Sequence, residues 1–301
     1  MWSEKRNWGE IFAPGHFKTD IMKRFFLLVL AVVMPLVMSA QAQINTKKEK
    51  IEDFTEKTIK VVMTGNIFFD QSFKDEIISR WRISPFEFCT MEEFDSLKTD
   101  SGYYFLLLVK SRFRKESRPG MDMLTVVKGG EAAEKGLSKM LDVVTVPLMS
   151  SENPSGREFI FLPALLDIIQ DHIMKSMETD VAGYSGLSNS NMNLLSAGTK
   201  DIIIAEDDLS SEVTPELVKE FAAMDILVTD TDTADEMMLE HTPNALVSFT
   251  VYPSDQAAGS FCYKMLIDAQ THKLYYFRRH KISRKFGPGF LIEDLDRIAE
   301  R

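Results

Sequence analysis

The stretch that decides the fold is Ile-Lys-Val-Val-Met-Thr-Gly-Asn at residues 59–66, because its pattern returns later in the chain. Residues Ile59–Met63 are mostly apolar, which is typical of a strand covered on both faces, and Gly65-Asn66 ends the run. About 140 residues further on, Asp201–Ala205 has the same character. These two segments are predicted to begin two copies of one structural unit.

The predicted elements behind each opening strand follow one order: strand, helix, strand, short helix, strand, strand. In the first copy, Thr90 and Glu93 form a capping box before the short helix. In the second copy, Thr214-Pro215 has the cap-then-proline order of a helix start. Four pairs of strands keep nearly the same separation: Ile59 with Asp201, Phe86 with Ile226, Tyr103 with Ala245, and Met121 with Phe261.

The alternation of strands and helices predicts an α/β fold, with α+β as the alternative, in two tandem copies joined by an insert. In the insert, Asp142–Met149 and Glu158–Leu162 are predicted strands, Pro163–Met177 is a predicted helix that starts at its proline, and Gly183–Thr199 is a predicted flexible loop. The predicted segments are 1–42 (upstream extension and signal peptide), 43–130 (first copy), 131–200 (insert) and 201–301 (second copy with a C-terminal helix).

Three features give this unit a family resemblance. They are the opening strand ending in Thr64-Gly65-Asn66, the segment Phe86–Cys89 before a Glu-rich short helix, and the hairpin Tyr263–Asp268/Leu274–Phe277. The unit resembles the small α/β domain at the amino end of TolB-type periplasmic proteins and in outer-membrane lipoproteins of the curli-secretion-pore type. The resemblance implies a role in envelope assemblies rather than catalysis, although fold alone does not fix function. The chain lacks the lipid-bearing cysteine of those lipoproteins, so pore formation is not implied.

The segment Met22–Ala42 predicts export. It has a basic start at Lys23-Arg24, an apolar run over Phe25–Met38, and small residues at Ala40 and Ala42. This is the pattern of a signal peptide cleaved after Ala42, with Met22 rather than Met1 as the predicted start. The alternative is a retained anchor behind a cytoplasmic tail, but the run is short for a membrane span. We therefore expect a periplasmic or secreted protein of a Gram-negative-type envelope, without a membrane span in the mature chain.

Charge and cysteine content restrict the partners. The chain has 35 Lys and Arg against 45 Asp and Glu, a net charge of -10 at pH 7. Such an acidic protein is poorly suited to nucleic acid, whose binding depends on neutralising phosphates. An envelope protein or surface component is the expected partner, and no cofactor is expected. Cys89 and Cys262 either form one disulfide or remain two buried thiols, and their apolar surroundings favour the thiols.

Two groups of carboxylates follow predicted strands in the second copy: Glu206, Asp207 and Asp208, then Asp230 and Asp232. Ligands of α/β sheets bind at the carboxyl ends of strands, and Mg²⁺ or Ca²⁺ prefers such oxygen ligands. A metal-dependent hydrolase is therefore the alternative function. Helix capping and loop solvation are the competing interpretation, and it is favoured. The sequence has no zinc, nucleophile-elbow or phosphate-loop motif, so no catalytic residue is predicted.

A partner surface is predicted where Tyr275, Tyr276 and Phe277 precede Arg278 and Arg279, because aromatic residues and arginine are common in interface hot spots. Two basic clusters, at 110–118 and 278–285, could contact lipid phosphates or an acidic partner, but the favoured explanation is that their charges protect edge strands. The predicted function is a non-catalytic binding or assembly module of the envelope. The oligomeric state is left open.

Overall fold

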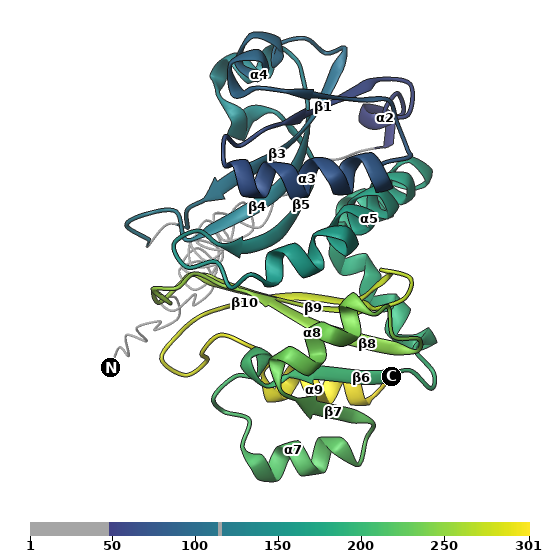
Figure 1. Ribbon diagram of the computed structural model, residues 1–301, viewed down its shortest axis with the longest axis vertical. Coiled ribbons are helices and arrows are strands. Elements are labelled where there is room, and N and C mark those ends of the chain that lie inside the picture. Colours follow the sequence, from purple (N-terminus) through teal and green to yellow (C-terminus); the bar gives the residue numbers. More distant parts are fainter. Residues whose placement is uncertain (1–47, 114–115) are drawn as a thin grey trace, which may run out of the picture. The chain divides into compact units, whose positions relative to one another are not determined.

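The computed structural model describes residues 48–113 and 116–301, and all of them belong to one compact unit, Asn45–Arg301. The predicted signal peptide, Met22–Ala42, lies outside the described residues. Within these residues the strands form two five-stranded sheets, and each sheet carries helices on both faces (Figure 1).

The first sheet and its helices, from β1 to α5, are named the N-module here. Its strands are β1 (Thr58–Val62), β2 (Phe86–Cys89), β3 (Tyr103–Ser111), β4 (Met121–Lys128) and β5 (Leu141–Ser150). Its helices are α3 (Ile67–Arg80), α4 (Met91–Leu97) and α5 (Arg157–Glu178), with 3₁₀ turns η1 (Glu131–Lys135) and η2 (Leu137–Lys139). A short helix, α2 (Lys48–Ile51), precedes it.

The second sheet and its helices, from β6 to α9, are named the C-module. Its strands are β6 (Asp201–Ala205), β7 (Ile226–Thr229), β8 (Ala245–Val251), β9 (Phe261–Asp268) and β10 (Leu274–Lys281). Its helices are η4 (Glu206–Asp208), α7 (Pro215–Ala222), α8 (Thr231–Leu239) and α9 (Ile292–Ala299). Helix α6 (Asp180–Ser185) and the 3₁₀ segment η3 (Gly186–Ser196) connect the two modules.

The two sheets have the same topology. Their strand orders are β2-β1-β3-β4-β5 and β7-β6-β8-β9-β10, which match strand for strand. In each sheet the first three strands of the module run parallel to one another. The fourth strand is antiparallel to both of its neighbours, the third and the fifth. Thr58 lies opposite Tyr103 in one sheet, and Asp201 lies opposite Ala245 in the other. The α/β prediction is therefore confirmed, with two similar units. Because β5 belongs to the first sheet, the N-module extends beyond residue 130 into the predicted insert.

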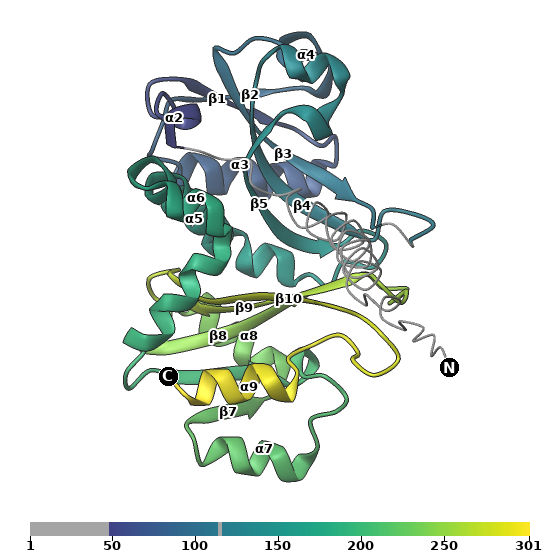
Figure 2. The same ribbon diagram turned by 180° about the vertical axis from the view of Figure 1, so that it is seen from behind.

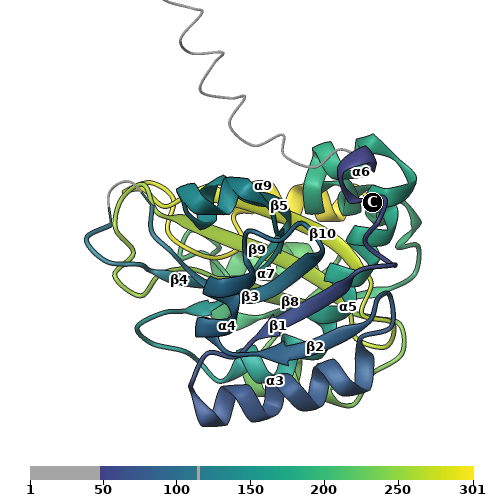
Figure 3. The same cartoon turned by 90° about the horizontal axis from the view of Figure 1, so that it is seen from above.

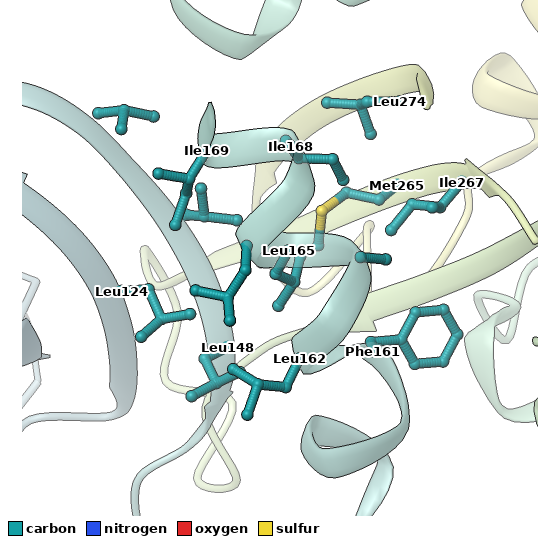
Figure 4. Packing of buried hydrophobic residues seen from close by; sticks show 14 of the residues in the cluster. Leu124, Leu148, Phe161, Leu162, Leu165, Ile168, Ile169, Met265, Ile267 and Leu274 are labelled. Atoms are coloured by element: carbon teal, nitrogen blue, oxygen red, sulfur yellow. The ribbon is translucent and has the colours of Figure 1, made fainter. Parts of the chain in front are cut away.

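Helix α5 lies between the two sheets and forms the centre of the main hydrophobic core. Figure 4 shows Leu162 on the side of Leu148 from β5, whereas Ile168 lies on the side of Met265 and Leu274 from the second sheet. Helices α3 and α8 pack beside α5 in the same layer. The outer face of the first sheet is covered by α4, η1 and η2, and that of the second sheet by α7, α9 and η3 (Figure 2).

The structure corrects the prediction around α5. Residues Glu158–Leu162 are not a strand, and Pro163 does not start a helix, because α5 begins at Arg157 and contains Pro163 in its interior. The cause is burial on both sides of the helix: a segment that is apolar all round has the same pattern as a short buried strand. The sequence offers Pro163 as a start signal, but the neighbouring sheets stabilise helix on either side of it.

The segment Gly183–Thr199 is also different from its prediction as a flexible loop. Its η3 portion packs along the edge strand β10. The side-chain amide of Asn191 accepts from the Phe277 backbone N–H at 2.7 Å and donates to the Phe277 carbonyl at 3.1 Å. Asn193 donates to the Leu274 carbonyl at 2.7 Å. These contacts occupy backbone groups that an edge strand would otherwise expose for pairing with another chain.

Candidate functional site

The acidic residues predicted as a metal site lie near the carboxyl ends of β6 and β7, but they have separate structural roles. The Asp230 carboxylate caps α8 by accepting from the Thr233 N–H at 2.8 Å. Asp207 is exposed and accepts from the Thr231 hydroxyl at 2.8 Å, and Glu206 and Asp232 are exposed. Within residues 48–113 and 116–301, no three His, Cys, Asp or Glu side chains are placed to hold a metal ion.

Asp208 is the exception, because it is buried and takes part in an ion-pair network with α5. Arg157 at the start of α5 donates from Nη1 to Asp208 at 2.9 Å and from Nε to Asp235 of α8 at 2.9 and 3.0 Å. Its Nη2 donates to the Ser248 carbonyl at 3.1 Å. The Ser248 and Thr250 hydroxyls also donate hydrogen bonds to the Asp208 carboxylate, at 2.6 and 2.5 Å. A guanidinium of the N-module therefore joins three elements of the C-module.

Aromatic rings surround this network, and its side chains are largely shielded from solvent. The Arg157 guanidinium carbon lies 5.2 Å from the Phe161 ring centroid and 5.5 Å from that of Phe249, and these two rings stack on each other. Burial raises the pKa of Asp235, and the nearby Arg157 opposes this rise. Burial alone would lower the pKa of Arg157, but the two carboxylates raise it. All of these groups are engaged with one another, so the network stabilises the packing of the two modules.

The predicted partner surface on β10 is largely interior. Tyr275 and Tyr276 are both buried, at 6% and 2% exposure, in the core beneath α9. A bulge between Leu274 and Tyr276 is the physical reason, because it breaks the alternation that would put one of two neighbouring side chains outside. The Tyr276 hydroxyl donates to Asp294 at 2.6 Å, which keeps that side chain in the core.

The remaining residues of the predicted surface have mixed roles. Arg278 donates to Asp294 at 3.0 Å and to Glu293 at 2.9 Å, so it holds α9 against the sheet. Phe277 is half-buried. Arg279 is exposed, and its guanidinium carbon lies 4.9 Å from the Phe261 ring centroid. Only the last part of the predicted surface therefore faces solvent.

The two cysteines lie in different sheets as buried free thiols, Cys89 in β2 and Cys262 in β9. Burial raises the pKa of Cys89 to about 11 and that of Cys262 to about 12. Because the thiolate is the reactive form, neither residue has the character of a nucleophile.

A polar cluster that the sequence analysis missed lies where α3 and α5 meet the β9–β10 turn. Asp167 of α5 accepts from Arg80 at 3.1 Å and contacts the His272 Nδ1 at 2.6 Å. The His241 ring lies beside His272, with centroids 5.4 Å apart. Arg80 and His272 are 87 and 105 residues from Asp167 in sequence, and no local motif joins them. The cluster links the two modules, as the Arg157 network does.

The first two residues of α3, directly after the turn from β1, present exposed apolar side chains: Ile67 and Phe68 are 81% and 86% exposed. The turn is held by hydrogen bonds. The Asp70 carboxylate accepts from the Thr64 and Gly65 N–H groups at 2.9 Å each, and the Asn66 side chain caps α3. Gly65 adopts a φ of +85°, which a residue with a side chain rarely takes. From the sequence alone, Asn66 is interpreted only as part of the end of the first strand, although the same residue is a usable N-cap signal for α3.

A cavity of about 270 Å³ opens between the β3–β4 loop and the β8–β9 loop. Its charged lining is mixed: Arg118 faces Glu152 and Asp255. Arg118 and Glu152 form an exposed ion pair at 3.5 Å. The nearby Glu116 is buried and accepts from the Phe113 N–H at 2.8 Å.

Comparison with models of protein families, with curated proteins and with solved structures returns no match for this chain. The resemblance to TolB-type and curli-pore-type domains therefore stays a prediction. Among the described residues, no helix has both the length and the apolar character needed to cross a membrane.

Proposed function

We propose that this chain is an exported, non-catalytic binding or assembly module of the cell envelope, and that it contacts an apolar surface of a partner protein through Ile67 and Phe68. The observation that carries the proposal is the exposure of these two side chains, 81% and 86%, at the start of α3, where the preceding turn is fixed by hydrogen bonds.

The free energy gained when a partner covers these two side chains supports a contact. Burying one large apolar side chain contributes about 1.5–3 kcal/mol, so two of them offer about 3–6 kcal/mol before the costs of association. The turn is already ordered by Asp70 and Asn66, so little conformational entropy is lost when a partner covers it. A rigid turn with an exposed aromatic residue has the properties of an interface hot spot.

The arrangement of the polar residues favours binding over catalysis. The carboxylates near the strand ends already have structural partners: Asp208 and Asp235 bind Arg157, and Asp230 caps a helix. Both thiols are buried with raised pKa values. The network and the polar cluster around Asp167 keep the two modules in one arrangement, which suits a rigid scaffold.

Site-specific cross-linking tests the contact. A photo-reactive amino acid at position 68 is compared with one at position 78, because Ile78 lies on the same helix and is also exposed, at 57%. We expect a discrete adduct from position 68 in envelope fractions and none from position 78, and the double variant Ile67→Ser/Phe68→Ser should prevent formation of the complex. Equal adducts from both positions, or none from position 68, would refute the contact. Amino-terminal sequencing of the purified chain tests export, with Gln43 as the expected first residue.

A further inference from the structure

Exposed cations gather at one end of the C-module, in a protein whose net charge is -10. Lys281 ends β10, and Arg284 and Lys285 follow in the loop to α9; all three are exposed. None of the three belongs to an ion pair among the residues that the structure describes. Their positive charge is therefore not offset by a direct carboxylate contact.

The N-module adds to this cluster through the loop after β3. Phe113 of that loop packs on Phe261 of β9, with ring centroids 4.9 Å apart. The Arg279 guanidinium and the Lys281 ammonium lie 4.9 and 5.8 Å from the same Phe261 ring. The exposed Arg112 precedes Phe113 directly. Figures 1 and 3 show the β3–β4 loop and the yellow loop after β10 on the same side of the molecule.

Part of the β10 edge is already occupied, because Asn191 and Asn193 bond to the backbone of Phe277 and Leu274. A partner that adds a strand is thereby disfavoured, and side-chain charge is what remains. The neighbouring cavity does not extend the positive region, since Glu152 and Asp255 offset Arg118. The attraction for anions is therefore centred on β10 and its following loop.

We propose that these cations form a site that docks the chain on an anionic lipid surface by contacting headgroup phosphates. The site is named the basic patch and consists of Arg112, Arg279, Lys281, Arg284 and Lys285. Its members are spread over one strand and two loops, which suits a plane of phosphates better than a single small anion. The half-buried aromatic rings of Phe113 and Phe261 pack the β3–β4 loop against the start of β9. This electrostatic contact is separate from the apolar contact at Ile67 and Phe68.

The expected change in affinity for the lipid surface follows from the charge of each side chain near that surface. A lysine or arginine near an anionic leaflet contributes about 1 kcal/mol, and each 1.4 kcal/mol is tenfold in affinity. Loss of two cations therefore weakens binding about 30-fold, and charge reversal weakens it further. The contact should also weaken as salt rises, since the Debye length falls to about 8 Å at 0.15 M ionic strength.

Sedimentation of the full chain with vesicles tests the proposal. The vesicles are phosphatidylglycerol mixed with phosphatidylcholine, or phosphatidylcholine alone. The patch variant is Arg284→Glu/Lys285→Glu. The matched control is Lys135→Glu/Lys139→Glu, which makes the same change of charge at exposed residues between β4 and β5, beyond the end of β4 that is opposite the β3–β4 loop. Every form carries the same residues 1–42, so this segment contributes equally to the binding of each form.

We expect the wild-type chain and the control to bind the anionic vesicles alike, and the patch variant to bind them at least 30-fold more weakly. All forms should bind zwitterionic vesicles equally. Three results would overturn the proposal: equal binding of the patch variant and the control, no preference of the wild type for anionic vesicles, or a patch-dependent affinity for an acidic peptide or for nucleic acid that exceeds the affinity for vesicles.

Discussion

Replacing Arg157 with methionine tests whether the buried ion-pair network holds the two modules together. The guanidinium makes hydrogen bonds of 2.9–3.1 Å to Asp208, Asp235 and the Ser248 carbonyl. The side chains of Arg157, Asp208 and Asp235 are exposed by only 11%, 1% and 10%. Methionine keeps an apolar stem beside the neighbouring rings but leaves two buried carboxylates without their cation.

The expected loss is large because the unpaired carboxylates stay buried. Removing one partner of a buried ion pair costs about 3–5 kcal/mol of unfolding free energy. For a chain of this size, each 1 kcal/mol shifts Tm by about 2–4 °C, so we expect Arg157→Met to lower Tm by about 6–20 °C. Ring contacts that the methionine stem retains would place the result near the lower end.

The unfolding free energy lost in Arg157→Met should depend on pH, and the pKa of Asp235 determines the direction of this dependence. Burial raises the pKa of Asp235, and Arg157 opposes this rise. Without Arg157 the pKa of Asp235 in the folded state rises further above its unfolded value. The folded state then binds the proton more tightly, so stability increases as pH falls through the folded pKa. The deficit of Arg157→Met is therefore greatest at neutral pH and decreases as the pH is lowered.

Urea unfolding followed by circular dichroism, at neutral pH and near pH 5, measures these effects. The matched control is Arg118→Met, which removes an ion pair whose members are 81% and 48% exposed and should cost less than about 1 kcal/mol. The double variant Arg157→Met/Asp235→Asn should recover part of the loss, because it removes one of the stranded charges. A deficit below about 1 kcal/mol, or the same deficit at both pH values, would refute the assignment of the network as a structural link.

Two further predictions follow from buried titratable groups. Burial alone would raise the pKa of Asp53, but hydrogen bonds from Tyr104 and two lysines lower it. The ionised Asp53 carboxylate therefore stabilises the folded state above the unfolded pKa, and this contribution is lost as pH falls through the folded pKa. Asp53→Asn should therefore cost about 1–3 kcal/mol at pH 7 and nothing once both proteins are strongly acidified, as measured by urea unfolding across this range. For Cys89 and Cys262, a disulfide-exchange reagent at pH 8 should modify neither thiol in the folded chain and both in guanidinium chloride; rapid modification in the native state, or no free thiol after unfolding, would contradict the assignment of two buried thiols.

Elements with a local signal were predictable from the sequence. The capping box of Thr90 and Glu93 starts α4 as predicted, and the Thr214 cap before Pro215 starts α7. Strand β2 (Phe86–Cys89) and strand β6 (Asp201–Ala205) have their predicted bounds. In each case the deciding interactions lie within a few residues of the element, so the local sequence contains them.

The candidate site depended on contacts that no local pattern records. Arg157 reaches Asp208 across 51 residues and Asp235 across 78. The burial of both Tyr275 and Tyr276 depends on a bulge, which shifts the side-chain alternation by one residue without a distinctive sequence at that position. The acidic residues were correctly expected near strand ends, but their partners were fixed by tertiary packing.

The stacking of the modules explains why two units of one topology differ in sequence. Helices α5 and α9 close their modules at corresponding places, each on the same face as the first long helix of its module. The second sheet covers the far side of α5, so α5 is buried on both sides, whereas the far side of α9 exposes Glu293, Asp296 and Arg297. The same position in the fold therefore requires an apolar helix in one module and an amphipathic helix in the other. The likeness of the two modules lies in the order and pairing of their strands. It also follows that a polar substitution such as Ile168→Asp in α5 should be far more destabilising than one on the exposed side of α9.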